Sequence, residues 1–320
     1  VTAFSYYFYY KSSGLYFFLL ALVTVSDFLL ANLIHRYRER RGLGKFFVTL
    51  SIIIDLGLLG YFKYTNFFVG MVQRFFTFQS LSYTIDVYRG HLKPLPSLLD
   101  YAFYVSFFPQ LVAGPIVRAS DFAPQIRQPL TITRDMFARG LFFILIGLFK
   151  KAVISDYISL NFVDRIFDNP GLYSGLENLL GIYGYAMQIY CDFSGYSDMA
   201  IGIALLLGFH FPLNFNAPYA ATNISDFWRR WHISLSTWIR DYIYISLGGN
   251  RKGKIRQFFN LIITMLLGGL WHGASLNFII WGGMHGVALA VHKVFSQGLL
   301  RHKRDYVSRG IRRPFAIFVT

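Results

Sequence analysis

Long apolar runs separated by short basic segments dominate the chain. A helix that crosses a bilayer core of about 30 Å needs about 20 mostly apolar residues. Residues 15–34, 46–68 and 137–154 have the length and composition for three such crossings. Lys150 and Lys151 stand near the end of the third run, where long side chains are expected to reach the membrane interface.

Two further apolar segments are interrupted. Residues 100–117 contain Pro109 and Pro115, which is typical of a kinked or re-entrant segment that lines the interior of a membrane protein. Residues 176–211 hold two apolar stretches on either side of the polar sequence DFSGYSD, residues 192–198. We therefore predict a break in the helical structure at residues 192–198.

An amphipathic segment, residues 226–247, follows. Its apolar side chains recur at spacings of three and four, so they share one face of a single predicted helix: Trp228, Trp231, His232, Leu235, Trp238, Ile239 and Tyr242. Asn223 and Ser225 are the candidate N-caps. We expect this helix to lie at the membrane interface or to pack its aromatic face against the other helices.

Residues 258–294 are predicted to form a helical hairpin. Basic clusters flank them on both sides, and such clusters collect on the cytoplasmic side of membranes, so the segment should enter and return. The turn is expected near residues 271–275, the sequence WHGAS. This arrangement places His272 deep in the protein.

Composition excludes an ordinary soluble domain. Hydrophobic residues make up 54% of the 320 residues and charged residues only 15%, against about a quarter in soluble domains. The mean hydropathy of +0.42 points the same way, and we conclude that the chain is an integral membrane protein. The single cysteine, Cys191, excludes an intrachain disulfide.

A formal charge of +15 would suggest nucleic acid in a soluble protein. Here the basic residues lie between apolar runs, within residues 36–45, 251–256 and 293–313, as cytoplasmic loops do. We expect no nucleic-acid partner. No internal repeat or linker is evident, so we predict one all-α, membrane-embedded domain, residues 1–320, with incomplete N- and C-termini.

Two of the eight histidines stand out. His232 lies on the predicted aromatic face, and His272 stands among glycines in the sequence GGLWHG, residues 268–273. An imidazole buried in a membrane protein is costly and needs a polar partner or cavity. A hydrogen-bonded core histidine is the alternative interpretation of either residue. His285 fits a helix contact among small residues.

The residues alone favour acid–base or group-transfer chemistry by histidine. The nucleophile motif Gly-x-Ser-x-Gly and a phosphate-binding glycine loop are absent from the sequence. His232, His272, His285 and Asp192 could in principle hold a metal, but HExxH spacing is absent, so no metal site is expected.

The sequence DFWRRWHISLS, residues 226–236, closely resembles the membrane-bound O-acyltransferase (MBOAT) superfamily. The resemblance is to the bacterial branch typified by the membrane subunit of alginate O-acetyltransferase. Further segments resemble that branch in the same order: FTFQSLSY (76–83), FFPQLVAGPI (107–116), DFSGYSD (192–198), YISLGGNR (244–251) and LWHGA (270–274). The resemblance runs from about residue 61 to residue 293.

This resemblance implies a multi-pass helical bundle in the bacterial inner membrane, surrounded by lipid, with kinked or re-entrant helices around a central tunnel. It implies acetyl-CoA or another acyl thioester as a donor substrate, with no permanently bound cofactor. The acetyl group would pass to a periplasmic SGNH-type partner that O-acetylates an exported polysaccharide such as alginate, cellulose or peptidoglycan. D-alanyl transfer to teichoic acid is a more distant possibility.

By the same resemblance, His272 and His232 are the catalytic residues. His272 is either the general base on the acceptor hydroxyl or a transient acyl carrier, and both remain open. His232 would orient the acceptor or stabilise developing charge. The candidate substrate-binding residues are Trp228, Trp231, Trp271, Gln110, Asp192 and Asn250.

The chain departs from the family pattern in two places. Residues 68–76 are shorter than usual and lack the Pro-Gly approach to the FTF segment, and the chain ends at Thr320 just after an apolar run begins at Pro314. Two rival interpretations are a transporter or flippase, which has broken helices and buried polar groups, and a non-catalytic scaffold subunit of a polysaccharide export system. The missing repeat argues against the first, and the two histidines in their motifs argue against the second.

Overall fold

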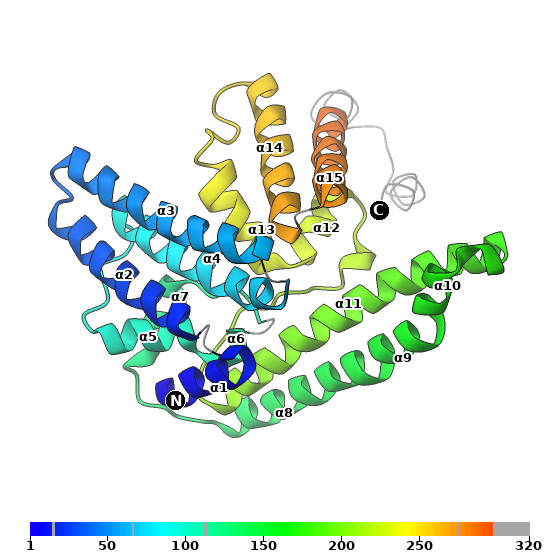
Figure 1. The fold of residues 1–320 in the computed structure, drawn as a ribbon, viewed down its shortest axis with the longest axis horizontal. Coiled ribbons are helices and arrows are strands. Elements are labelled where there is room, and N and C mark those ends of the chain that lie inside the picture. Colours follow the sequence, from blue (N-terminus) through cyan, green and yellow to red (C-terminus); the bar gives the residue numbers. More distant parts are fainter. Residues whose placement is uncertain (15–16, 66, 112–113, 274, 297–320) are drawn as a thin grey trace, which may run out of the picture. The chain divides into compact units, whose positions relative to one another are not determined.

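The computed structural model describes residues 1–320 except 15–16, 66, 112–113, 274 and 297–320, and it omits the side chains of 12–13, 59 and 61–75. The described residues form helices joined by turns and loops, without a strand (Figure 1). They fall into two compact units, residues 1–213 and 214–320, which are described separately. The apolar run predicted from Pro314 lies outside the described residues.

The first unit begins with α1 (Thr2–Ser13), α2 (Phe17–Arg36), α3 (Arg41–Thr65) and α4 (Phe67–Arg89). Helices α2, α3 and α4 pack against one another. The helices predicted at residues 15–34 and 46–68 are confirmed, while the sequence analysis did not identify α4. Among the described residues, α2 is the helix long and apolar enough to cross a membrane by itself.

Polar side chains inside α2–α4 are buried and bonded to one another. The hydroxyl of Ser51 donates to Asp27 at 2.9 Å, and the hydroxyl of Ser80 donates to Asp55 at 2.9 Å. These bonds satisfy one oxygen of each carboxyl group and so reduce the cost of burying it, because a buried polar group without a partner is costly.

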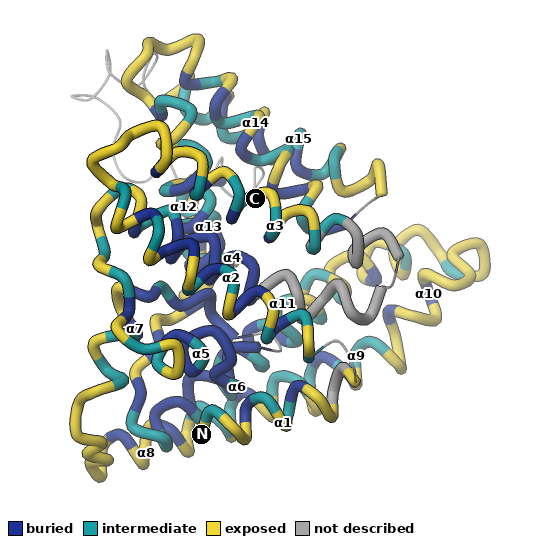
Figure 2. The backbone as a smooth tube through the Cα atoms, turned by 60° about the vertical axis from the view of Figure 1, so that its left-hand side comes forward, coloured by how far each residue is buried: buried dark blue, intermediate teal, exposed yellow. Residues whose placement is uncertain are grey.

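The broken segment at residues 100–117 is confirmed. Helix α5 (Leu98–Ser106) ends before the short α6 (Phe108–Leu111), and α7 (Ala119–Ile126) follows an irregular stretch. The buried rings of Phe103, Phe107, Phe122 and Phe209 meet with centroids 5.1–5.6 Å apart. Figure 2 marks the buried residues around α5 and α6 in dark blue. This cluster forms the core of the first unit.

The run predicted at 137–154 is the middle of a longer helical rod. Helix α8 (Arg134–Leu148) continues through the π-helical turns η2 (Phe149–Ser155) and η3 (Ser159–Val163), with α9 (Asp156–Ile158) between them, and ends with α10 (Asp164–Asp168). Helix α11 (Gly175–Leu206) packs along it, and a capping box of Ser174 and Glu177 begins that helix.

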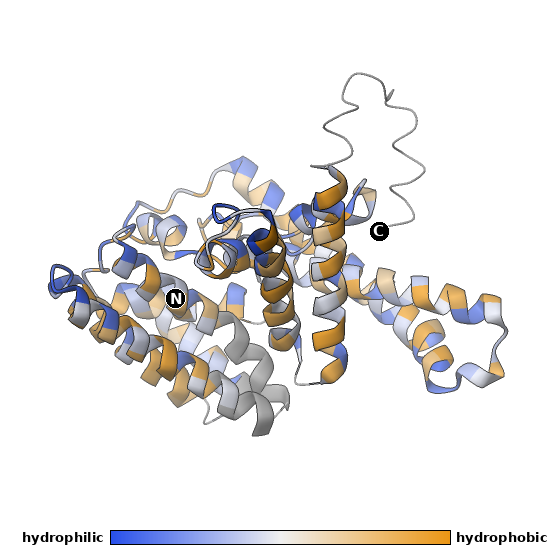
Figure 3. Ribbon diagram, turned by 90° about the horizontal axis from the view of Figure 1, so that it is seen from above, coloured by the Kyte–Doolittle hydropathy of each residue, from blue (hydrophilic) through white to orange (hydrophobic). Residues whose placement is uncertain are grey.

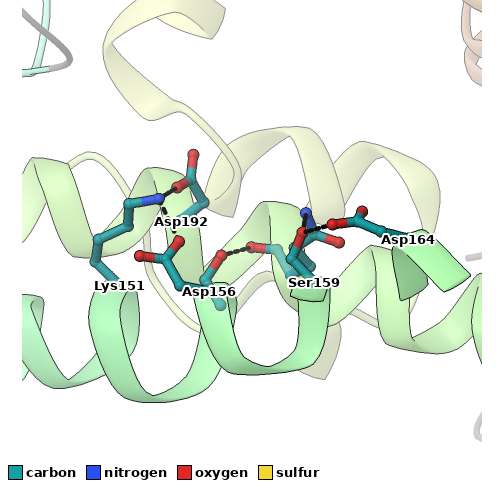
Figure 4. A network of polar contacts seen from close by, with 7 residues as sticks. Lys151, Asp156, Ser159, Asp164 and Asp192 are labelled. Atoms are coloured by element: carbon teal, nitrogen blue, oxygen red, sulfur yellow. Dashed lines mark hydrogen bonds and ion pairs between the residues drawn. The ribbon is translucent and has the colours of Figure 1, made fainter. Parts of the chain in front are cut away.

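The break predicted at residues 192–198 is wrong, since α11 runs through them. Lys150 lies 2.7 Å from Asp198. Lys151 lies 2.6 Å from Asp192, and Figure 4 shows this second pair. Both lysines thus have acidic partners on α11. Their charges neutralise the two carboxylates, so the polar sequence stays helical.

The second unit contains α12 (Ile224–Arg230), α13 (Ile233–Ile239), the π-turn η6 (Arg240–Tyr244), α14 (Lys254–His272) and α15 (Leu276–Val294). Helices α14 and α15 form the predicted hairpin. The single helix predicted at 226–247 is wrong, because the chain leaves the helical path between α12 and α13. Asn223 is the N-cap of α12, and its side chain accepts from the backbone of Asp226 at 2.9 Å.

Large apolar side chains stand exposed along several helices. Phe142 and Leu145 of α8, Leu176 of α11, Phe259 of α14 and Met284 of α15 are examples. Figure 3 colours the hydrophobic residues along these helices in orange. Exposed apolar area of this extent indicates contact with something other than water.

Candidate active site

The α14–α15 hairpin positions His272. This residue is the last of α14, and the backbone of Gly273 beyond it is extended. The His272 ring lies 5.1 Å from the indole of Trp281 and 4.8 Å from that of Trp271, measured between centroids. Aromatic rings from both arms of the hairpin therefore surround the imidazole.

A cavity of about 400 Å³ opens beside His272 within the second unit. Its apolar lining includes Trp228, Trp281 and Met265, and three cationic residues, Arg229, Arg240 and Lys293, also line it. The cavity thus combines an apolar body, one imidazole and positive charge, which suits a ligand with an apolar part and an anionic part.

His232 occupies the break between α12 and α13. Its backbone has a φ of 42°, in the left-handed region that residues other than glycine adopt infrequently. Its side chain is only 1% exposed. Such conformations persist where the surroundings hold them, and they cluster at functional sites.

Asn214 holds this break from the preceding loop. Its backbone oxygen accepts from the amide of Ile233 at 2.8 Å, and its side-chain oxygen lies 3.1 Å from Nδ1 of His232. The same side-chain oxygen accepts from the amide of Ser234 at 3.2 Å and from its hydroxyl at 2.8 Å. Hydrogen bonds from the backbone and the side chain of Asn214 therefore hold the break between α12 and α13.

The structure brings the two candidate histidines together around Trp271. The Trp271 indole lies 6.5 Å from the His232 ring and 4.8 Å from the His272 ring. Burial, assisted by the nearby His272 imidazole, holds the pKa of His232 well below its usual value. His232 is accordingly a neutral imidazole at physiological pH.

The tryptophans predicted to share one helical face separate at the break. Trp228 lines the cavity, and its ring lies 5.2 Å from that of His285. Trp231 packs instead on Phe215, with centroids 5.2 Å apart. Trp271 lies between the histidines and is not part of the cavity lining.

The remaining candidate substrate-binding residues lie outside this cavity. Asn250 is in the exposed turn between η6 and α14. Gln110 belongs to the first unit, where its side chain is buried and donates to the backbone oxygen of Tyr104. Asp192, also in the first unit, is paired with Lys151.

Sequence analysis missed several residues of the site. Asn214 lies in an irregular segment without periodicity, so no pattern linked it to His232. Trp281 and Lys293 belong to the predicted hairpin, but which face of α15 meets the cavity depends on packing. Arg229 and Arg240 are not part of the predicted aromatic face, and the structure places both in the cavity lining.

Comparison with known proteins identifies the family. The sequence profile of MBOAT, the membrane-bound O-acyltransferase family, matches residues 6–318. The chain is 46% identical to "Probable alginate O-acetylase AlgI" of Pseudomonas syringae pv. tomato over 266 residues, covering 76% of this chain and 51% of the relative. It is 44% identical to "Probable alginate O-acetylase AlgI" of Azotobacter vinelandii, covering 86% of this chain and 59% of the relative.

The name of a third relative gives a different polymer, peptidoglycan. The chain is 41% identical to "Peptidoglycan O-acetyltransferase" of Helicobacter pylori, covering 79% of this chain and 56% of the relative. The chain thus spans little more than half the length of these curated relatives. The profile match over nearly all residues, together with these identities, shows that the chain belongs to the membrane-bound O-acyltransferase family.

Proposed function

We propose that this chain is a membrane O-acyltransferase that takes an acetyl group from cytosolic acetyl-CoA. The acetyl group passes through a tunnel in the protein to a periplasmic SGNH-type acetyltransferase, which O-acetylates an exported polysaccharide. Family membership supports acyl transfer. The names of the relatives support alginate or peptidoglycan as the class of final acceptor.

The observation that carries the proposal is the cavity with His272 in its lining. Its apolar walls exclude water from the thioester, and Arg229, Arg240 and Lys293 provide positive charge for the phosphates of the donor. An acyl thioester attached to a phosphate-bearing carrier combines these two features.

Two routes of acetyl transfer use the His272 imidazole. As a general base, it takes the proton of the acceptor hydroxyl while the hydroxyl oxygen attacks the thioester carbonyl. The C–S bond then breaks and the thiolate leaves with the proton that His272 carries. As a nucleophile, the imidazole nitrogen first bonds to the acetyl carbon, the C–S bond breaks, and the thiolate leaves with the proton of the other ring nitrogen. The acceptor oxygen then displaces the imidazole from the acetyl carbon, and the imidazole takes up the hydroxyl proton.

The proposal places residues 1–320 in the bacterial inner membrane as one multi-pass domain. The match to the family profile extends through both compact units, which supports a single functional domain. The exposed apolar side chains of α8, α11, α14 and α15 support contact of these helices with lipid.

The test is acetyl transfer in a defined system. The purified protein in lipid nanodiscs is incubated with radiolabelled acetyl-CoA, with and without an SGNH-type acetyltransferase from the same organism. We expect label on the partner or on its glycan. Label that accumulates on the protein itself when the partner is omitted indicates the nucleophilic route. Absence of any transfer with the partner present would favour the transporter or scaffold interpretation.

A further inference from the structure

Helix α13 receives its N-terminal cap from a residue outside its own sequence. The N-cap residue, His232, makes no side-chain capping bond. The first amide, of Ile233, donates to the backbone oxygen of Asn214, and the second, of Ser234, donates to the side-chain oxygen of Asn214. Asn214 thereby satisfies two donors that a helix N-terminus leaves without intrahelical partners.

These bonds determine which atom of Asn214 faces His232. A backbone amide only donates, so the Asn214 atom that bonds the amide of Ser234 must be the side-chain oxygen and not the nitrogen. The same atom lies 3.1 Å from Nδ1 of His232. An amide oxygen only accepts, so Nδ1 of His232 carries the hydrogen.

The tautomer of His232 follows. In a neutral imidazole one nitrogen donates and the other accepts, so Nε2 holds the lone pair. Asn214, Phe215, Trp271 and His272 face His232. Of these four, His272 is the ionisable residue, and a positive charge on it would oppose a second charge on His232.

We propose that Asn214 is a positioning residue that fixes His232 in the Nδ1–H tautomer and so presents Nε2 as the nitrogen that accepts a proton or hydrogen bond during acyl transfer. The catalytic part of this statement rests on the proposed function, while the tautomer does not. The hydrogen bond that one ring nitrogen of a histidine makes determines which of the two nitrogens carries the proton.

Capping alone is the competing explanation for Asn214, and the chain offers a matched control. Asn223 caps α12 through the same kind of bond and is not among the residues that contact His232. Asn214→Asp keeps the oxygen acceptor, Asn214→Leu removes it, and Asn223→Leu removes a cap elsewhere.

The readout is ¹⁵N solid-state NMR of the histidine rings in the full-length protein in lipid bilayers, with His232 assigned by its loss in His232→Gln. Wild type, Asn214→Asp and Asn223→Leu should show His232 protonated at Nδ1. Asn214→Leu should show a shift toward the Nε2–H tautomer. A wild-type signal protonated at Nε2 overturns the proposal, as does a tautomer that Asn214→Leu leaves unchanged.

The NMR result does not depend on acyl transfer, so it separates failure of this proposal from failure of the proposed function. In the transfer assay, we expect Asn214→Leu to lower kcat by about 10²–10⁴-fold, the range for lost acid–base catalysis. Asn214→Asp should recover most of that loss, and Asn223→Leu should leave kcat close to wild type. Equal losses of kcat in Asn214→Leu and Asn223→Leu would show that Asn214 acts only as the N-terminal cap of α13.

Discussion

Gly269 of α14 and Gly282 of α15 face each other where the two helices pack. A Cβ on Gly282 would lie 3.1 Å from Cα of Gly269 and would overlap the carbonyl oxygen of Met265. A Cβ on Gly269 would overlap the carbonyl oxygen of Phe278. Only glycine permits this approach of the two backbones. Their contact lies one turn before His272 and fixes the end of α14 against α15.

Gly282→Ala should therefore destabilise the hairpin and displace His272. Its new methyl group meets backbone atoms that cannot rotate away, and overpacking of this kind costs about 1–3 kcal/mol. We expect a lower melting temperature in detergent together with reduced acetyl transfer.

Gly283→Ala is the neighbouring control. Its Cβ would make an ordinary contact at 3.4 Å with the Leu266 side chain, and alanine favours a helix over glycine by roughly 1 kcal/mol. Equal destabilisation by the two substitutions would contradict the packing described above.

The ion pair of Lys150 and Asp198 should contribute measurably to stability. Asp198 is mostly buried, with 13% of its side chain exposed. Asp198→Ala removes the hydrogen bond from the charged Lys150, which is worth about 1.5–3 kcal/mol. In Asp135→Asn, loss of the exposed pair with Arg139 should cost at most about 0.5 kcal/mol. Thermal unfolding of both variants measures the difference, and similar melting temperatures would refute it.

Acid should destabilise the protein partly through His232. The folded-state pKa lies well below the usual value of about 6.5, so between those two values the unfolded chain binds the extra proton. This contribution to the free energy of unfolding is complete above about pH 6.5 and falls as the pH drops below it. Melting temperatures of wild type and His232→Gln from pH 8 to pH 5 test this: the variant should lose less stability on acidification. Parallel curves would count against it.

The cationic lining of the cavity should act on donor binding. We expect Arg229→Gln and Lys293→Gln to raise KM for acetyl-CoA with little change in kcat, because both residues would attract phosphate without touching the reacting carbonyl. Added salt should raise KM in wild type more than in these variants. Arg139→Gln, on the exposed surface of α8, is the control. An unchanged KM for acetyl-CoA in both cavity variants would show that Arg229 and Lys293 do not contribute to donor binding.

Periodicity and apolar length predicted much of the fold. Helices α2 and α3, the interrupted segment around Pro109 and the α14–α15 hairpin all have local signatures in apolar length, prolines or flanking charge. The polar sequence at 192–198 led to a wrong prediction, because the lysines that neutralise its two carboxylates lie 41 and 48 residues earlier in the chain. Pairing over that distance leaves no local pattern.

The sequence predicted the two histidines of the candidate site, but it did not predict the residues that position them. His232 and His272 follow from motifs within single segments. The break at His232 depends on bonds from Asn214, 18 residues away, and helical periodicity continues through it undisturbed. Asn250 has a motif position but lies in an exposed turn. Long-range hydrogen bonds and packing account for each of these differences.

The transfer assay with His272→Ala tests the central claim most directly. In nanodiscs with radiolabelled acetyl-CoA and the SGNH-type partner, His272→Ala should abolish acetyl transfer while its melting temperature stays near that of wild type. His285→Ala, which removes an imidazole of the same hairpin that is not in the cavity lining, should retain transfer. A folded His272→Ala protein that transfers acetyl groups at the wild-type rate would show that His272 is a packing residue, and His232 would become the candidate centre.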